Sequence, residues 1–432
     1  MRSRSLLSAL ALLASFAGCA PEEREIPADA IKVGAVLPFT GKEAAIGRNL
    51  EQALLLAVKD VNEAGGVRGR PLHLVTRDSN SGSARGLDAL LELLYLEEVE
   101  YLIGPEENEL ANDIVPDVKA LDVLNLLPGY SAPAMKRGGT RGAWVRLAPS
   151  PAAIGCAMAR QAIAEGVDTA NSIVALDDYN LSLAAEFNAQ FVHLGGRALP
   201  SVTISAGASS YRAQIAQALD YEADRTLLIA YPATASVVAT EWTIGRRRGA
   251  FTLSPMLHAD AFLVNTPFGA LDGFAGLSPS LSLTSECDSG TPNGPVSCSR
   301  ENARAFSDHF AARWEGDRPF PAAHFYYDAV VLLAMALERE LARGNDDPTA
   351  PELRDAIREL GGGDAEPAHW SELSPALAAL ADGGSRRYVG AAAEYDFDEF
   401  GIARHVVFDT WSIARGAFVE TGRLMASCPR HL

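Results

Sequence analysis

Apolar and polar residues follow one another in two patterns, one typical of buried strands and the other of amphipathic helices. A strand is predicted at Ile31–Leu37, a glycine-containing loop follows from Pro38 to Gly47, and a helix begins near Asn49. Apolar residues recur in this helix at the spacing of one helical face, and the pair Gly65–Gly66 is expected to end it. Because a helix that follows such a loop directs its first N–H groups at the loop, an anion-binding position is expected here.

The same order of strand and helix patterns continues through the chain and predicts an α/β fold with parallel sheets. Most predicted strands are short apolar runs without polar alternation, as strands covered on both faces should be. They lie at Pro71–Asp78, Tyr101–Gly104, Val123–Pro128, Ser172–Leu176, Ser201–Ser205, Thr226–Tyr231 and Phe251–Leu257. A break at Trp144–Ser150 indicates two lobes, and the segment Gly361–Gly384, rich in Ala and Gly, is expected to be a surface insertion.

The length of the chain predicts more than one domain, and its net charge excludes some classes of partner. A chain of 432 residues is too long for one ordinary core. Its formal net charge of −18 argues against a nucleic-acid partner, which would require clustered Lys and Arg. The sequence has no motif of an acyl-transfer, metalloprotease or nucleotide-binding enzyme, so neither catalysis nor a cofactor or metal is expected.

The first residues have the pattern of an export signal. Arg2 and Arg4 precede the short apolar run Leu6–Phe16, and small residues stand directly before Cys19. This order resembles a bacterial lipobox. It implies that residues 1–18 are a lipoprotein signal peptide and that Cys19 carries a lipid anchoring the protein to the membrane. The alternatives are an ordinary signal peptide cut nearby and a free Cys19.

Export permits disulfides, and the cysteine spacing suggests one. Cys287 and Cys298 bracket a short polar loop, so these two residues are expected to pair. Such a bridge is worth roughly 2–4 kcal/mol. Cys156 and Cys428 could pair by elimination, or Cys156 could be a buried thiol.

Several motifs occur together in one order. They are a glycine- and alanine-containing pattern from Gly41 to Gly69, Leu102–Pro105, Leu127–Pro133, the strand Trp144–Arg146, Tyr326–Ala329 and the turn Asp396–Gly401. The chain thereby resembles the type I periplasmic solute-binding proteins, in the leucine/isoleucine/valine-binding branch that serves ABC transporters.

The resemblance implies two Rossmann-like, doubly wound lobes joined by three crossing strands, with ligand bound between the lobes. Lobe 1 would comprise residues 31–146 plus 271–385, and lobe 2 would comprise 149–268 plus 387–432. The crossings would lie near Ala148, Phe268 and Tyr388.

The resemblance also implies ligand-binding residues. Ser131, after Tyr130, matches the hydroxyl that holds a ligand carboxylate, although it could simply cap a helix. Asn108 stands where the family has Ser or Thr, beside three glutamates. Tyr179 and Tyr231 match aromatic positions of the second lobe, with packed loop residues as the alternative. No Glu aligns with the family's ammonium-binding carboxylate, for which Asp260 is the nearest substitute.

These features predict an extracytoplasmic lipoprotein that captures an amino acid or related polar compound and delivers it to an ABC permease. Because acids flank Asn108 and none aligns in the second lobe, a cationic or neutral ligand is as plausible as leucine. The alternative is an envelope lipoprotein of the same fold that acts as a sensor or activates a cell-wall enzyme without a small-molecule site.

Overall fold

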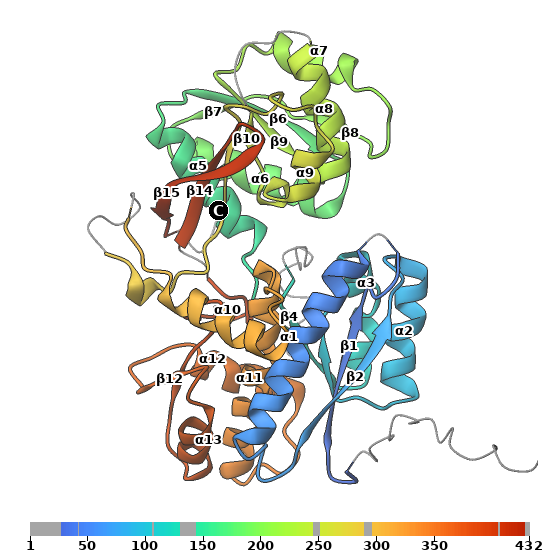
Figure 1. Cartoon of the computed structure of the whole chain (residues 1–432), viewed down its shortest axis with the longest axis vertical. Helices are drawn as coiled ribbons and strands as arrows, with labels where there is room; N and C mark the ends of the chain where they lie inside the picture. The colour runs from blue at the N-terminus through green and yellow to red at the C-terminus, as the bar shows by residue number, and fades with distance from the viewer. Residues whose placement is uncertain are drawn as a thin grey trace, which may run out of the picture.

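The protein consists of two α/β lobes, each built on its own sheet (Figure 1). This computed structural model describes residues 27–41, 43–105, 108–129, 144–244, 251–288, 296–404 and 407–427, without the side chains of residues 83, 108, 109 and 112. The predicted class, a pair of doubly wound lobes, is confirmed. Within the described ranges, no helix is long and apolar enough to cross a membrane.

The first sheet has five strands in the order β2-β1-β3-β4-β5, and all neighbours are parallel. Its strands are β1 (Ile31–Leu37), β2 (Leu72–Asp78), β3 (Tyr101–Ile103), β4 (Leu124–Leu127) and β5 (Trp144–Arg146). β1 and β3, which lie in the middle, are buried almost throughout, as expected for strands covered on both faces.

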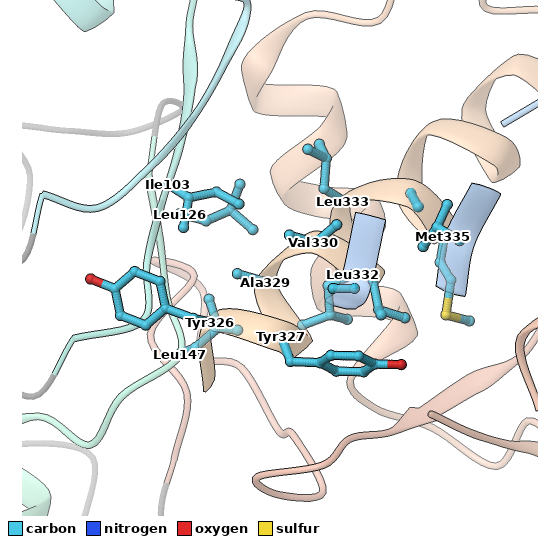
Figure 2. Packing of buried hydrophobic residues seen from close by; sticks show 14 of the residues in the cluster. Ile103, Leu126, Leu147, Tyr326, Tyr327, Ala329, Val330, Leu332, Leu333 and Met335 are labelled. Carbon is cyan, nitrogen blue, oxygen red and sulfur yellow. The ribbon is translucent and has the colours of Figure 1, made fainter. Parts of the chain in front are cut away.

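Helices cover both faces of this sheet. One face packs on α1 (Ala44–Glu63), α10 (Glu301–Arg313), α11 (Pro321–Ala342), α12 (Ala350–Leu360) and α13 (Leu373–Ala381). The other packs on α2 (Ser83–Tyr95), α3 (Asn108–Asp113) and α4 (Val115–Ala120). Figure 2 shows Ile103 and Leu126 of the sheet facing Val330 and Leu333 of α11, a helix that is buried along most of its length.

Helix α1 begins at Ala44, five residues before the predicted start at Asn49. Gly47 therefore lies inside the helix and not in the preceding loop. A Cβ at this position would lie 2.1 Å from the carbonyl oxygen of Pro38, so only glycine lets the helix approach the end of β1 so closely.

The second sheet has the order β15-β14-β11-β10-β9-β6-β7, and β8 also pairs with β6. Its strands are β6 (Thr169–Ala175), β7 (Arg197–Ala198), β8 (Val202–Ile204), β9 (Arg225–Ile229), β10 (Thr252–Leu253), β11 (Ala275–Pro279), β14 (Val407–Ala414) and β15 (Ala417–Met425). The last two form an antiparallel hairpin at one edge, and the other pairings except β11 with β14 are parallel.

Two helical layers enclose the second sheet. Helices α5 (Pro151–Ala164) and α6 (Asp178–His193) pack on one face. Helices α7 (Arg212–Asp220), α8 (Pro232–Ile244) and α9 (Asp260–Val264) pack on the other, with the 3-10 turn η1 (Pro255–Leu257).

The chain passes between the sheets three times, and two of the passages lie later than predicted. The first, between β5 and α5, matches the expected position near Ala148. The second follows β11, whose strand hydrogen-bonds to β10 and β14, so residues 275–279 belong to the second sheet and not to lobe 1.

The third passage precedes β14. The predicted crossing at Tyr388 instead lies in β13 (Arg387–Val389), which pairs with β12 (Pro367–His369). Tyr388 is buried there and donates a hydrogen bond to Asp328 of α11. Apolar run length alone does not show which sheet a short strand joins.

The segment Gly361–Gly384 is not the surface insertion that its composition suggested. It contains β12 and α13, and Leu373, Ala376, Leu377 and Leu380 of α13 are buried in the core of the first lobe. These residues have helical spacing, but the surrounding Gly and Ala obscured it.

The structure joins Cys287 and Cys298 in a disulfide, with an S–S distance of 2.06 Å. Cys156 is buried in α5 and is also disulfide-bonded. Cys19 and Cys428 lie outside the described residues.

Candidate functional site

The carboxyl ends of the parallel strands mark the candidate site in both lobes. β5 ends at Arg146, and the chain then crosses to α5 in the second lobe, so the carboxyl edge of the first sheet lies next to the junction between the lobes. In open α/β sheets this edge is where ligands bind. The residues that follow each strand are therefore the candidate ligand contacts.

In the loop after β1, the donors of Phe39 and Thr40 are already engaged within the protein. The N–H groups of Phe39 and Thr40 donate to Oδ1 of Asp78, at 2.8 and 3.1 Å, and the hydroxyl of Thr40 donates to Oδ2 at 2.5 Å. Burial acts to raise the pKa of Asp78, but these hydrogen bonds outweigh it and lower the pKa. The carboxylate of Asp78 in β2 thus satisfies these donors, and the anion position predicted at the first turn of α1 stays a prediction.

Arg146, the last residue of β5, is a buried cation at the junction. Its side chain is 2% exposed, and Nε and Nη2 have no hydrogen-bond partner among the described residues. Burial lowers the pKa of Arg146 to about 10, so the guanidinium is still charged at neutral pH. The backbone of Arg146 is bonded to one neighbouring segment, because its N–H donates to the carbonyl of Gly401 and its carbonyl accepts from the N–H of Ala403.

Tyr179 of the second lobe lies close to Arg146. It stands in the first turn of α6, after β6, and its side chain is 1% exposed. Its hydroxyl has no hydrogen-bond partner in the described part of the chain. Burial raises the pKa of Tyr179 well above its usual range, the nearby charge of Arg146 opposes this, and Asp177 adds to it.

The sequence caps α6 and thereby fixes Tyr179. Asp177 is the N-cap, and its carboxylate accepts from the N–H of Asn180 at 3.0 Å and from the amide of Asn180 at 2.6 Å. The carboxylate of Asp177 is therefore engaged locally. Tyr179 of the second lobe lies within electrostatic range of Arg146 of the first.

Two other predicted ligand residues also follow strands of the second sheet. Tyr231 comes directly after β9, is half-buried and already has an interaction partner. Asp260 is exposed at the start of α9, and its charge acts to raise the pKa of His258, which burial lowers. His258 stacks on Trp411 with ring centroids 4.7 Å apart.

Ser254 and Arg146 are candidates that the sequence-based reasoning did not select as ligand residues. Ser254 directly follows β10, is fully buried, and its hydroxyl lacks a partner among the described residues. For Arg146 a signal did exist, since a single cation interrupts the apolar run from Trp144 to Ala148.

Three predicted site residues cannot be placed. Tyr130 and Ser131 lie outside the described residues, as does the predicted lipidation site Cys19. Asn108 is the first residue of α3, but its side chain is not described. Over the described residues, no group of three or more His, Cys, Asp or Glu could hold a metal ion.

Comparisons with known proteins agree with this geometry. The family model described as "Periplasmic binding protein" matches residues 30–369. A curated relative, Leu/Ile/Val-binding protein homolog 7 of Brucella suis, is 32% identical over 98 residues, which is 23% of this chain and 23% of the relative. The same protein of Brucella melitensis matches equally.

Solved structures share the fold over nearly their whole length. The leucine binding protein LivK of Thermotoga maritima superposes with a TM-score of 0.70 at 19% identity, covering 92% of this chain and 99% of that one. LivJ of Streptococcus pneumoniae, in complex with isoleucine, gives 0.66 at 16% identity over 93% of this chain and 100% of its own.

A solute-binding protein of Rhodopseudomonas palustris, in complex with benzoate, gives a TM-score of 0.65 at 18% identity and covers 93% of this chain and 98% of its own. The family match spans most of the sequence, and the chain forms two α/β lobes. The chain therefore belongs to the periplasmic binding protein family, with the type I fold.

Proposed function

We propose that this protein is an extracytoplasmic solute-binding protein that captures a small polar ligand between its lobes and delivers it to an ABC transporter. The observation that carries the proposal is the electrostatic interaction of Arg146 and Tyr179, two buried side chains from different lobes. Nε and Nη2 of the arginine and the hydroxyl of the tyrosine have no partner among the described residues. Buried polar groups are normally hydrogen-bonded, so such an arrangement is typical of a ligand site.

Contact with both lobes also supplies a mechanism. A ligand that touches Arg146 on one lobe and Tyr179 on the other binds the closed arrangement more tightly than the open one. That difference in contact energy is what shifts an open–closed equilibrium and presents a closed form to a permease. Structural relatives in complex with isoleucine and with benzoate support a small organic ligand of amino-acid size.

The first experiment is a thermal-shift screen of the protein against amino acids, amides, polyamines and small carboxylates. A ligand that binds the native state raises the melting temperature. Loss of the shift in Tyr179→Ala and Ser131→Ala would support the proposed site, in which Tyr130, Asn108, Tyr231 and Asp260 are further proposed contacts. A shift that survives both substitutions would place the site elsewhere.

Attachment through a lipid on Cys19 is a separate part of the proposal, supported by the small residues before this cysteine. Mass spectrometry of the protein from a membrane fraction should show an acylated N-terminal cysteine. The variant Cys19→Ala should appear in the soluble fraction. An unmodified N-terminus in the wild type would remove the anchor from the proposal.

The second candidate function is a sensor or activator of the same fold that has no small-molecule site. The engagement of Phe39 and Thr40 by Asp78 favours it, because donors that could serve a ligand are satisfied internally. X-ray scattering distinguishes the two functions. Solute binding predicts a more compact particle with the compound found in the thermal screen, whereas a scaffold keeps one shape with every compound.

A further inference from the structure

Among the described residues, the buried side chain of Arg146 has no carboxylate partner, unlike two other arginines that are largely buried. Arg423 contacts the carboxylates of Asp409 and Glu420 at 2.7 and 2.8 Å, and the largely buried Arg339 contacts Glu359. Arg146 is more deeply buried than either, yet Nε and Nη2 are without a partner throughout the described residues. A buried charge is unfavourable unless it is paired, so this position is suited to an anion from outside the chain.

The chemistry of the groups that meet here selects the kind of anion. The guanidinium offers N–H donors in a planar fork and no acceptor, and it matches a carboxylate through two parallel hydrogen bonds. The buried hydroxyl of Tyr179 can donate a third. One fixed positive charge balances one negative charge, which favours a monoanionic carboxylate over a doubly charged phosphate.

The electrostatics of the whole protein make this local cation more important. The chain carries a formal net charge of −18, so an anionic ligand is repelled by the protein as a whole. The carboxylate of Asp177, two residues before Tyr179, is engaged in capping α6, and Asp178, which directly precedes Tyr179, is exposed to solvent. The arginine supplies the attraction at the junction itself.

We propose that the ligand carries a carboxylate that bridges the guanidinium of Arg146 in the first lobe and the hydroxyl of Tyr179 in the second. This inference rests on the proposed solute-binding function and names the ligand class. It places the carboxylate on an arginine at the end of strand β5. Arg146 is then the residue that makes the site specific for ligands that carry a carboxylate.

The test compares matched compounds on matched variants. Acetate, the pair benzoate and benzamide, and the pair leucine and leucinamide are titrated into wild type, Arg146→Met, Arg146→Lys, Tyr179→Phe and the control Arg197→Met. Arg197 is exposed and lies beside the amino end of β6, away from the junction, so its replacement makes the same change of charge without touching the site.

We expect acetate and at least one of the larger carboxylates to raise the melting temperature of wild type and Arg197→Met, and the amides to leave it unchanged. In Arg146→Met the affinity for that carboxylate should fall at least about 30-fold, as when one partner of a buried charge pair is removed. Arg146→Lys should retain part of the effect because it keeps the charge but loses the fork. Tyr179→Phe should weaken binding by about 3-fold to 10-fold.

Several results would overturn the inference. Carboxylates that shift Arg146→Met as much as wild type, amides that bind as well as acids, or the absence of any carboxylate effect would each exclude it. A stronger Arg146-dependent effect of inorganic phosphate than of acetate would also exclude a carboxylate as the ligand class. Circular dichroism of Arg146→Met and Arg146→Lys establishes that a lost shift is not a lost fold.

The same data separate this inference from the function on which it rests. If a neutral or cationic compound binds in the broad screen and its binding does not depend on Arg146, the proposed carboxylate ligand is excluded and the solute-binding function is retained. If no compound in the screen raises the melting temperature of the wild type, both the solute-binding function and the carboxylate ligand are excluded.

Discussion

Two buried charged side chains of the first lobe differ in their hydrogen-bond partners. Asp328 of α11 is fully buried, and its carboxylate accepts four hydrogen bonds, from the hydroxyls of Tyr388 and Tyr395 and the N–H groups of Ala391 and Ala392, at 2.7 to 2.9 Å. Arg146 of β5 is almost as buried, and its Nε and Nη2 find no acceptor in the described part of the chain.

The difference separates a structural charge from one suited to a ligand. The Asp328 cluster fixes the chain around β13 to the central helix, since every contact is made by the protein itself. At the lobe junction the protein leaves donors unsatisfied, which lowers stability and is maintained in proteins mainly where function requires it.

The largest effect is expected from breaking the satisfied cluster. In Asp328→Asn the amide nitrogen faces donors in place of an acceptor, so buried N–H and O–H groups lose their partners. The free energy of unfolding should fall by about 3–5 kcal/mol, measured by urea denaturation at neutral pH. The control Asp346→Asn, at an exposed position, should change it by less than about 0.5 kcal/mol. Equal effects would remove the structural role of the cluster.

His324 of the same helix is a buried base that, unlike Arg146, can lose its charge at neutral pH. Burial lowers the pKa of His324 to about 4 from an ordinary value of 6.5, whereas burial leaves Arg146 charged at neutral pH. The folded state therefore binds fewer protons than the unfolded chain between these pH values. The contribution of His324 to the free energy of unfolding is therefore complete above pH 6.5. It falls by about 3 kcal/mol as the pH falls toward 4.

The measurement is the free energy of unfolding of wild type and His324→Phe from pH 4 to 7. The wild type should lose stability more steeply on acidification. Parallel profiles for the two proteins would show that His324 titrates normally in the folded state. His193→Phe, at an exposed position, serves as the control and should leave the slope unchanged.

Two buried tyrosines provide the next comparison. The hydroxyl of Tyr388 donates to Asp328 at 2.7 Å, whereas that of Tyr179 has no partner within the described residues. Tyr388→Phe should lower the free energy of unfolding by about 2 kcal/mol, as expected for a hydrogen bond to a charged group. Tyr179→Phe should change it by less than about 0.5 kcal/mol in the absence of ligand. A similar loss in both variants would mean that Tyr179 is bonded within the protein.

The smallest effect concerns Arg146 itself. Replacing an unpaired buried cation by an apolar side chain of similar length should raise the stability of the ligand-free protein by about 1 kcal/mol in Arg146→Met. Thermal unfolding in a buffer without carboxylates measures this. A clear loss of stability would show that the guanidinium is paired within the protein, which contradicts the contrast with Asp328.

Most of the fold could be predicted from the sequence, because strand and helix patterns are local. The seven predicted strands from Pro71–Asp78 to Phe251–Leu257 all overlap observed strands. The positions where the chain crosses between lobes were harder to predict, because β11 and β13 are short strands and β11 pairs with a strand far away in the sequence. Helix α13 was missed since its apolar face lies within an Ala- and Gly-rich segment.

The site could be predicted only in part. Tyr179 was predicted from its place in the family motif, and the structure buries it at the lobe junction. The loop after β1 was expected to hold an anion, but sequence does not show that Asp78 of the neighbouring strand reaches its donors. For Arg146 the cation in an apolar strand was visible, but its missing counter-ion was not.

By itself the sequence determined the two-lobed α/β class, most of the secondary structure and the pairing of Cys287 with Cys298, because periodicity and close spacing act over short stretches of chain. Only the tertiary structure decided which carboxylates are engaged, where the chain changes lobes and that Arg146 meets Tyr179. These outcomes depend on exclusion of water and on contacts between residues distant in the sequence, and neither is written in a local pattern.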